Sequence, residues 1–350
     1  MKILQAMAGA EHGGAERFFV RLAIALNRAG VAQKVVIRRN ATRALELRQG
    51  GVDPVELPFG GKFDWQTRRG LKREIQAFQP DIVLTWMNRA TALCPTGRKN
   101  GFVHMARLGG YYDLKYYQAC DHLIGNTEDI VEYLIKESWP PERAHYLPNF
   151  VNGTVSEPIS RQTLFTPDSA PLILAMGRFH ENKGFDVLLE AMARVPDAYL
   201  WLAGDGPLRE ELGKLAEKVG VKPRVRFLGW RDDIGALLQT CDVFVCPSRH
   251  EPLGNVVLEA WAQGKPVIAA DSYGPGTLIE HLQTGVLVPI NEPGLMAKAI
   301  RNVFSDRNLR QRIAEQGYEM YAANFTEDIV TSHYLEFFNR ILAPCAASPA

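Results

Sequence analysis

The chain has 350 residues, 46% of them hydrophobic and 23% charged, with a formal net charge of +1. This length suits two domains, and the composition is that of a soluble globular enzyme. No apolar run approaches the ~18 residues that a membrane span needs, and Glu11 and His12 interrupt any signal-peptide core, so we expect a cytoplasmic protein. The five cysteines lack C-x-x-C and metal-ligand spacing, and we expect reduced thiols.

Strand-like and helix-like segments alternate in the first half of the chain. Apolar runs predict strands at 3–7, 34–37, 81–85, 102–108 and 122–125. Amphipathic spacing predicts helices at 15–29, 42–49, 68–78 and 127–137. Residues 154–170 are rich in Ser, Thr and Pro, and they predict a linker.

Positive charge is concentrated in this first half. Residues 1–165 hold 22 Lys and Arg against 16 Asp and Glu, whereas the remainder holds 18 against 23. The run 62–73 combines aromatic residues with cations: Lys62, Phe63, Trp65, Arg68, Arg69, Lys72 and Arg73. Such a segment could make peripheral contact with the anionic inner face of the cell membrane, or it could bind an acidic acceptor. The alternative is a solvated helix face.

The second half repeats the alternation. Strands are predicted at 172–176, 199–203, 225–228, 243–246, 267–270 and 286–288. Helices are predicted at 185–195, 208–219, 234–241 and 255–263, with a short one near Leu278. The alternation implies an α/β protein with two Rossmann-like domains, 1–165 and 166–325. A last amphipathic helix is expected at 326–342, followed by a loose end at Pro344–Ala350.

Two carboxylates stand eight residues apart in the segment from Glu251 to Glu259. Because a predicted strand precedes it, Glu251 falls on a loop at the carboxyl end of that strand. Gly254 then opens the predicted helix that carries Glu259. Ligands bind at this edge of an open parallel sheet, and the free amides of a helix start suit phosphate.

Four local patterns together resemble the retaining glycosyltransferases of the family 4 type, also called glycosyl transferases group 1. They are Gly13-Gly-Ala-Glu16, Gly177-Arg-Phe-His-Glu-Asn-Lys-Gly184, Gly204-Asp-Gly-Pro207 with Val225-Arg-Phe-Leu-Gly-Trp230, and the Glu251/Glu259 segment with Gly264-Lys-Pro-Val-Ile-Ala269. The resemblance spans most of the chain. It implies the GT-B fold, in which two doubly wound parallel-sheet domains face across a cleft. It also implies that the last helix packs back on the first domain.

The resemblance implies transfer of a sugar from a nucleoside-diphosphate sugar to an acceptor hydroxyl, with retention at the anomeric carbon. We favour a UDP-sugar donor and a glycan or glycolipid acceptor of the bacterial envelope or lipopolysaccharide. No metal or other cofactor is expected, because side chains and amides can neutralise the diphosphate. No nucleic-acid partner is expected either.

Individual roles follow from the same resemblance. Glu259 matches the position that binds the ribose hydroxyls, and Glu251 matches the one that contacts the donor sugar. Arg178 and Lys183 would stabilise the charge on the departing diphosphate, although solvated surface cations are the alternative. The other donor-binding candidates are Gly13, Gly14, Gly177, Arg231, Leu253, Gly254 and Asn255.

The first domain offers three further candidates. Many family members have a histidine beside the donor sugar, and either His104 or Arg107 could take this catalytic position. His104 lies mid-strand, where a core histidine is the alternative. Asn126 follows a strand end and resembles the segment that lines the acceptor side, and Thr127 after it is a plausible helix cap.

Two other functions share this fold: a GT-B-fold UDP-sugar 2-epimerase and a non-catalytic sugar-nucleotide-binding protein. The Gly13–Glu16 and Glu251/Glu259 patterns favour the transferase. A nicotinamide dehydrogenase is disfavoured, because the glycines at 9–14 lack the G-x-G-x-x-G spacing.

Overall fold

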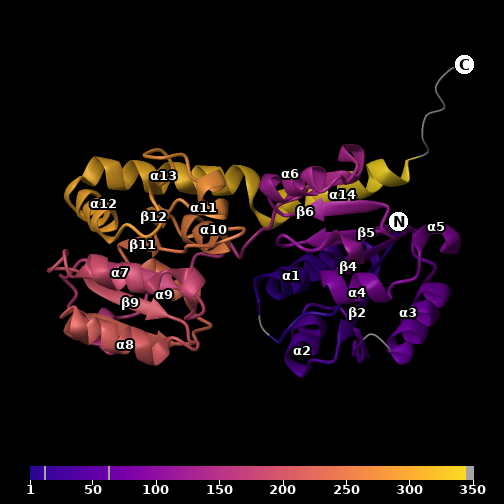
Figure 1. Ribbon diagram of the computed structural model, residues 1–350, viewed down its shortest axis with the longest axis horizontal. Helices are drawn as coiled ribbons and strands as arrows, with labels where there is room; N and C mark the ends of the chain where they lie inside the picture. Colours follow the sequence, from indigo (N-terminus) through magenta and orange to yellow (C-terminus); the bar gives the residue numbers. More distant parts are fainter. Residues whose placement is uncertain (12, 62–63, 344–350) are drawn as a thin grey trace, which may run out of the picture. The chain divides into compact units, whose positions relative to one another are not determined.

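The computed structural model describes residues 1–11, 13–61 and 64–343 (Figure 1). His12, Lys62, Phe63 and the tail Pro344–Ala350 lie outside the described residues. The chain forms two compact units. Unit 1 comprises Met1–Phe150 and the segment from Glu327 onward, and unit 2 comprises Val151–Thr326.

Unit 1 is built on a seven-stranded parallel sheet with the order β3-β2-β1-β4-β5-β6-β7. Its strands are β1 (Lys2–Met7), β2 (Ala32–Arg38), β3 (Val55–Leu57), β4 (Ile82–Trp86), β5 (Val103–Leu108), β6 (His122–Gly125) and β7 (Ala144–Tyr146). β1 pairs with both β2 and β4. The strand order therefore changes direction between β1 and β4, and the loops after these strands leave the sheet at the same edge.

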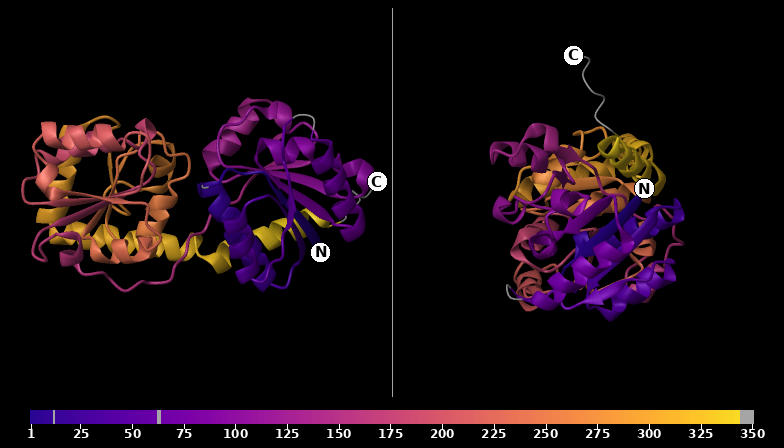
Figure 2. Two further views of the ribbon diagram at one scale, coloured as in Figure 1. Left: turned by 90° about the horizontal axis from the view of Figure 1, so that it is seen from below. Right: turned by 90° about the vertical axis from the view of Figure 1, so that its right-hand side faces the viewer.

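Helices cover both faces of this sheet (Figure 2). They are α1 (Gly14–Arg28), α2 (Ala41–Gln49), α3 (Trp65–Phe78), α4 (Met87–Leu93), α5 (Gly97–Asn100), α6 (Glu128–Lys136) and α14 (Glu327–Leu342). Alternate strand residues point to opposite faces. Leu84 accordingly packs in the core under α1, α2 and α14, whereas Val83 packs under α3 and α4.

The C-terminal helix α14 belongs to unit 1, although its sequence follows unit 2. Its buried residues Val330, Phe337 and Phe338 join the same hydrophobic core as α1. The ring of Tyr334 lies 6.3 Å from that of Phe18 on α1. This apolar stripe produces the amphipathic spacing of the segment.

Unit 2 contains a six-stranded parallel sheet with the order β10-β9-β8-β11-β12-β13. Its strands are β8 (Leu172–Met176), β9 (Tyr199–Ala203), β10 (Val225–Gly229), β11 (Val243–Cys246), β12 (Val267–Ala270) and β13 (Val286–Val288). Its helices are α7 (Phe185–Met192), α8 (Arg209–Lys218), α9 (Ile234–Thr240), α10 (Asn255–Ala262), α11 (Tyr273–Leu278), α12 (Pro293–Ser305) and α13 (Arg307–Asn324). Here the strand order changes direction between β8 and β11.

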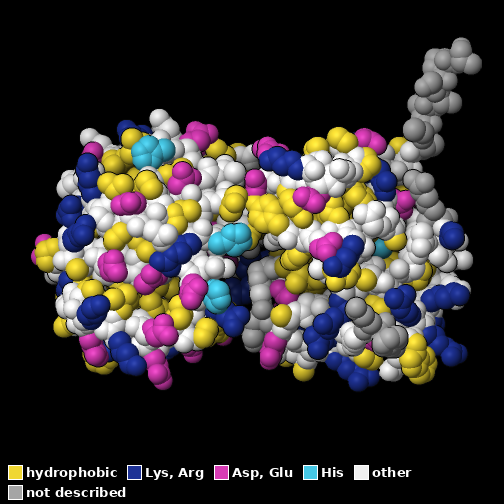
Figure 3. All heavy atoms as spheres, viewed as in Figure 1, with side chains coloured by type: hydrophobic (Ala, Val, Ile, Leu, Met, Phe, Trp, Pro, Cys, Tyr) yellow, Lys and Arg dark blue, Asp and Glu magenta, His cyan; other side chains and the backbone are white. Residues whose placement is uncertain are grey.

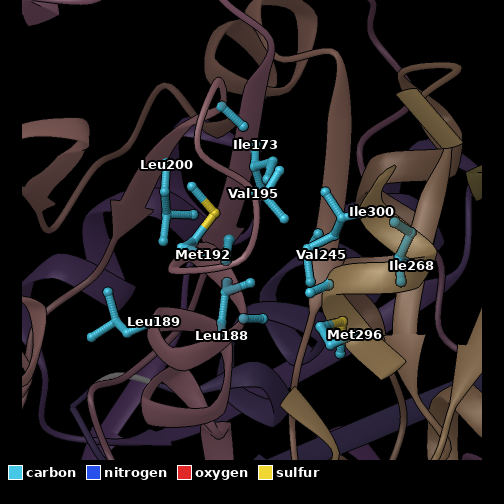
Figure 4. Close-up of a cluster of buried hydrophobic side chains, with 14 of the residues drawn as sticks. Ile173, Leu188, Leu189, Met192, Val195, Leu200, Val245, Ile268, Met296 and Ile300 are labelled. Carbon is cyan, nitrogen blue, oxygen red and sulfur yellow. The ribbon is translucent and has the colours of Figure 1, made fainter. Parts of the chain in front are cut away.

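Two cores sandwich the unit 2 sheet. On one face, Leu188 of α7 and Ile300 of α12 pack with Val245 of β11 (Figure 4). On the other face, Phe244 packs with Trp261 of α10. Both units are thus doubly wound α/β layers, as the alternation of elements predicted.

The boundary between the units lies after Phe150, earlier than the expected boundary at residue 165. The segment 154–170 is not a free linker, because hydrogen bonds attach it to unit 2. The amide of Ile159 donates to Thr240 Oγ1 at 2.9 Å, and Arg161 Nη2 donates to Asp242 Oδ1 at 2.8 Å. The polar side chains and the prolines that suggested a linker therefore belong to an ordered segment.

Several elements were absent from the sequence expectation, namely β3, β7, α4, α5, α12 and α13. β3 and β7 have three residues each, too few for a clear period. The long helix α13 buries only Ile313, Gly317 and Tyr321 among its residues, so its apolar period is weak.

Candidate active site

The carboxyl ends of β8 and β11 lie side by side, because these two strands pair in the unit 2 sheet. This is the point where the strand order changes direction, the usual ligand position in an open α/β sheet. The loop after β8 carries Arg178 and Lys183, and the loop after β11 carries Glu251. Unit 2 therefore places three predicted site residues at one edge.

Lys183 and Glu251 form an ion pair at this edge. Lys183 Nζ donates to Glu251 Oε2, which also accepts a hydrogen bond from Ser248 Oγ at 3.4 Å. Burial alone would lower the pKa of Lys183, but the charge and the hydrogen bond of Glu251 outweigh burial, and the pKa is raised. Because ordinary lysine is already protonated at neutral pH, Lys183 is a fixed cation here.

Gly184 allows the two loops to approach each other. Its φ of +61° is in the left-handed region, and a Cβ there would collide with the carbonyl oxygen of Pro247. Only glycine satisfies both conditions. This close packing explains how Lys183 reaches Glu251.

The segment from Glu251 to Glu259 runs from the loop into α10. Gly254, with φ +76°, is the N-cap residue, and as a glycine it has no side chain to cap the helix. Leu253 is buried, and Asn255 and Glu259 are partly exposed in the first turns. An uncapped helix start with partial positive charge can bind an anion.

The segment after β12, which runs through Ser272 into α11, completes this edge. Its residues were not among the predicted site residues. The amide of Gly274 donates to the carbonyl of Glu251 at 2.7 Å. Ser272 is buried, and its hydroxyl has no hydrogen-bond partner among the described residues. The sequence signal was the glycine-rich run Tyr273-Gly-Pro-Gly276, which is separated from a predicted strand by two residues.

The two other cations predicted for unit 2 differ in their surroundings. Arg178 follows Gly177 and is exposed, with no hydrogen bond or ion pair to any described residue. Arg231 instead forms a two-point ion pair with Asp233, with Nε donating to Oδ1 at 2.7 Å. Arg178 is therefore available to a ligand, whereas the guanidinium of Arg231 is already engaged.

Unit 1 presents a similar edge. Gly13 is the N-cap residue of α1 and offers no capping side chain, so the helix start at Gly14 is uncapped. Asn126 follows β6 and is buried, and its Oδ1 has no partner among the described residues. Thr127 beside it caps α6 by accepting from the amide of Ile130 at 3.2 Å.

His104 and Arg107 are both buried in the interior of unit 1. His104 shares a 3.0 Å hydrogen bond with Thr85 Oγ1, and burial lowers its pKa to about 4. Arg107 Nε donates to Tyr334 Oη at 2.8 Å, and its guanidinium lies 4.5 Å from the ring centre of Phe18. Both side chains thus bond and pack within the core, and a contact between one of them and the donor sugar stays a prediction.

Cys94, Cys120, Cys241 and Cys246 are buried free thiols, and Cys345 lies outside the described residues. Across residues 1–11, 13–61 and 64–343, no three His, Cys, Asp or Glu side chains are grouped to hold a metal ion. Over the same residues, no helix is both long and apolar enough to cross a membrane.

Two protein-family models together match most of this chain. The family models for glycosyl transferases group 1 and for glycosyltransferase family 4 match residues 156–320 and 12–154. The chain belongs to this family, because it is also 39% identical to the lipopolysaccharide core biosynthesis glycosyltransferase LpsE of Rhizobium meliloti, over 93% of this chain and 95% of the relative.

Two further similarities extend over nearly the whole chain. The lipopolysaccharide core biosynthesis glycosyltransferase LpsD of the same organism is 35% identical, over 98% of this chain and 99% of its own. The crystal structure of Anabaena HepE in complex with UDP and glucose is similar with a TM-score of 0.84 at 21% identity, over 97% of this chain and 100% of that one. The expectation of a GT-B fold is confirmed.

Proposed function

We propose that this glycosyltransferase moves a sugar from a UDP-sugar to an acceptor hydroxyl with retention of configuration. The observation that carries the proposal is the Lys183–Glu251 pair at the strand-order reversal, next to the uncapped start of α10. The diphosphate lies against Arg178, Lys183 and the first amides of α10. Glu251 contacts the donor sugar, and Glu259 binds the ribose hydroxyls.

A front-face mechanism fits these residues. The bond between the anomeric carbon and the diphosphate oxygen breaks, and the acceptor oxygen bonds to the same face of that carbon. A diphosphate oxygen takes the proton of the acceptor hydroxyl. Arg178, Lys183 and the helix amides stabilise the charge that grows on the leaving group. Because these groups supply the positive charge, the reaction needs no metal ion.

The acceptor that we propose is a lipopolysaccharide core. LpsE and LpsD, which match this chain over nearly its full length, are named for lipopolysaccharide core biosynthesis. Asn126 follows β6, and its Oδ1 has no hydrogen-bond partner within the described part of the chain. It is the proposed contact on the acceptor side.

Thermal unfolding with UDP, GDP, ADP, CMP and NAD tests the donor. A ligand at ~100 times its dissociation constant stabilises a protein by ~2.7 kcal/mol. We expect UDP alone to raise the melting temperature, and Glu259→Ala and Arg178→Ala to abolish the rise. Lys214→Ala, an exposed cation on α8, is the control. If none of the nucleoside diphosphates stabilises the protein, the proposal is wrong.

Product analysis separates the transferase from its alternatives. A retaining transferase yields a glycoside whose anomeric configuration, read by NMR, equals that of the donor, and yields it only with acceptor present. A 2-epimerase would convert the UDP-sugar without an acceptor. A non-catalytic protein would bind UDP and leave the UDP-sugar unchanged.

We also propose that the α3 face of unit 1 contacts an anionic membrane. Trp65 is 71% exposed at the start of α3, and Lys and Arg side chains gather over this part of unit 1 (Figure 3). The exposed cations of α3 are Arg68, Arg69, Lys72 and Arg73. Each would add ~1 kcal/mol of attraction near the surface.

Flotation with phosphatidylserine vesicles tests this contact. Replacing the four α3 cations by alanine should weaken binding. The matched control replaces four exposed cations of unit 2, namely Lys214, Lys218, Lys298 and Arg301. Equal binding of the two variants would refute the proposal.

A further inference from the structure

Two buried charged side chains hold the loop between β1 and α1. Glu16, in the first turn of α1, is 5% exposed and accepts a hydrogen bond from the amide of Ala10 at 2.7 Å. Arg43 of α2 is 4% exposed, and its Nη2 donates to the carbonyls of Ala10 at 2.5 Å and Glu11 at 3.3 Å. Ala10 is thus bonded through both its N–H and its C=O.

The carboxylate of Glu16 also excludes side chains from two loop positions. A Cβ at Gly9 or at Gly13 would come closer than 3.0 Å to it. A carboxylate in the first turn of a helix normally stabilises the amides of that helix. Here its bond instead goes to the amide of Ala10, outside α1, and Gly13 provides no cap.

Burying either charge costs desolvation free energy, and the opposite charge of the other side chain offsets part of this cost. Burial lowers the pKa of Arg43, while the negative charges of Glu16 and Glu46 act to raise it. A buried charge persists when hydrogen bonds and an opposite charge offset its desolvation. In this loop, those hydrogen bonds are made to backbone atoms that precede the uncapped start of α1.

We propose that Glu16 and Arg43 are positioning residues, which hold this loop in the conformation that lets Gly13 and Gly14 approach the donor. The inference rests on the proposed role of these glycines in donor binding. A loop that is already ordered loses less conformational freedom when the ligand binds, and affinity rises accordingly. Arg43 was absent from the candidates because it lies 33 residues beyond Ala10, on another helix.

Hydrogen–deuterium exchange tests the loop without any ligand. In Glu16→Ala the amide of Ala10 loses its acceptor, so a peptide covering residues 8–11 should exchange about tenfold faster. The free energy of local opening falls by roughly the contribution of one hydrogen bond. Peptides from β5 should be unchanged. Glu16→Gln keeps an acceptor oxygen and should keep slow exchange. If the peptide covering residues 8–11 exchanges at the wild-type rate in both Glu16→Ala and Arg43→Ala, the inference is overturned.

Calorimetric titration with UDP tests the link to binding. Glu16→Ala and Arg43→Ala should each raise the dissociation constant about tenfold, and Glu16→Gln should restore most of the affinity. Because both side chains bond to the backbone of Ala10, the dissociation constant of the double variant should be little higher than that of either single variant. Glu132→Ala, which removes an exposed carboxylate on α6, is the control.

The two proposals fail in different ways. If the wild type does not bind UDP, the proposed donor is wrong, and the exchange experiment alone decides whether the two side chains hold the loop. If UDP binds the wild type, Glu16→Ala and Arg43→Ala with equal affinity, the positioning role is wrong although the donor stands. Equal unfolding midpoints of Glu16→Ala and Glu16→Gln separate the positioning effect from a general loss of stability.

Discussion

Lys183 and Glu251 are 68 residues apart in the chain, and their side chains form an ion pair at the carboxyl edge of the unit 2 sheet. They meet because β8 and β11 are neighbours and because Gly184 lets the two loops touch. Removing one partner of such a pair leaves an uncompensated buried charge. The pair therefore stabilises the site and also fixes a cation and a carboxylate relative to each other.

Lys183→Met should weaken UDP binding, because it removes a cation proposed to contact the diphosphate. We expect the dissociation constant to rise on the order of tenfold to a hundredfold, the usual range for one charge-assisted contact. Isothermal titration calorimetry measures it, with Lys214→Met on α8 as the control. Unchanged affinity would show that Lys183 serves only to hold Glu251.

Gly184→Ala should destabilise the protein more than a substitution at an ordinary left-handed glycine. The new Cβ meets the carbonyl of Pro247, whereas at Gly220, with φ +73°, it meets nothing within 4 Å. We expect a loss of about 1 kcal/mol for Gly220→Ala from backbone conformation alone. For Gly184→Ala we expect about 2–4 kcal/mol. Equal losses in chemical denaturation would contradict the close contact.

Tyr334→Phe should lower stability and leave UDP affinity unchanged. It removes the hydroxyl that accepts from Arg107 Nε, so a buried guanidinium loses a partner, at a cost of about 1–3 kcal/mol. Tyr318→Phe, at an exposed position of α13, is the control. A drop in turnover at unchanged stability would instead support the predicted catalytic role of Arg107.

Acid should destabilise unit 1 partly through His145. Its Nε2 lies 3.0 Å from Nδ1 of His122, and its ring packs on Phe337 of α14. Burial, with the charges of His122 and Arg340, lowers the pKa of His145 to about 4. The unfolded value is about 6.5, so the unfolded chain binds more protons between these values. The free energy of unfolding should therefore fall as the pH decreases from about 6.5 to about 4.

His145→Phe should reduce this acid sensitivity by about 1 kcal/mol, a figure discounted for the partial exposure of the ring. Urea denaturation at pH 7 and pH 4.5 measures the difference. His333→Asn, on an exposed face of α14, is the control. His104 should contribute a parallel loss, because its pKa is also lowered to about 4. An identical pH dependence in the wild type and His145→Phe would refute this account.

Much of the fold could be predicted because burial follows local spacing. The run from Leu172 to Met176 is a fully buried parallel strand, and the stripe from Val330 to Phe338 is one helix face. Short strands such as β7 and the mostly polar helix α13 carry too little of this signal. The segment 154–170 was predicted as a linker although it is hydrogen-bonded to unit 2. Ser, Thr and Pro occur both in linkers and in ordered segments whose polar groups find partners elsewhere.

The sequence by itself determined the two doubly wound domains, the family, and the loops that carry Arg178, Lys183 and Glu251. These follow from periods of two and 3.6 residues and from motifs, which are local properties of the chain. Only the tertiary structure decided that Lys183 pairs with Glu251, that Arg107 bonds to Tyr334, and that Arg43 holds the loop at Ala10. The partner of a charged side chain depends on which distant loops and helices meet, and strand order and close packing decide that.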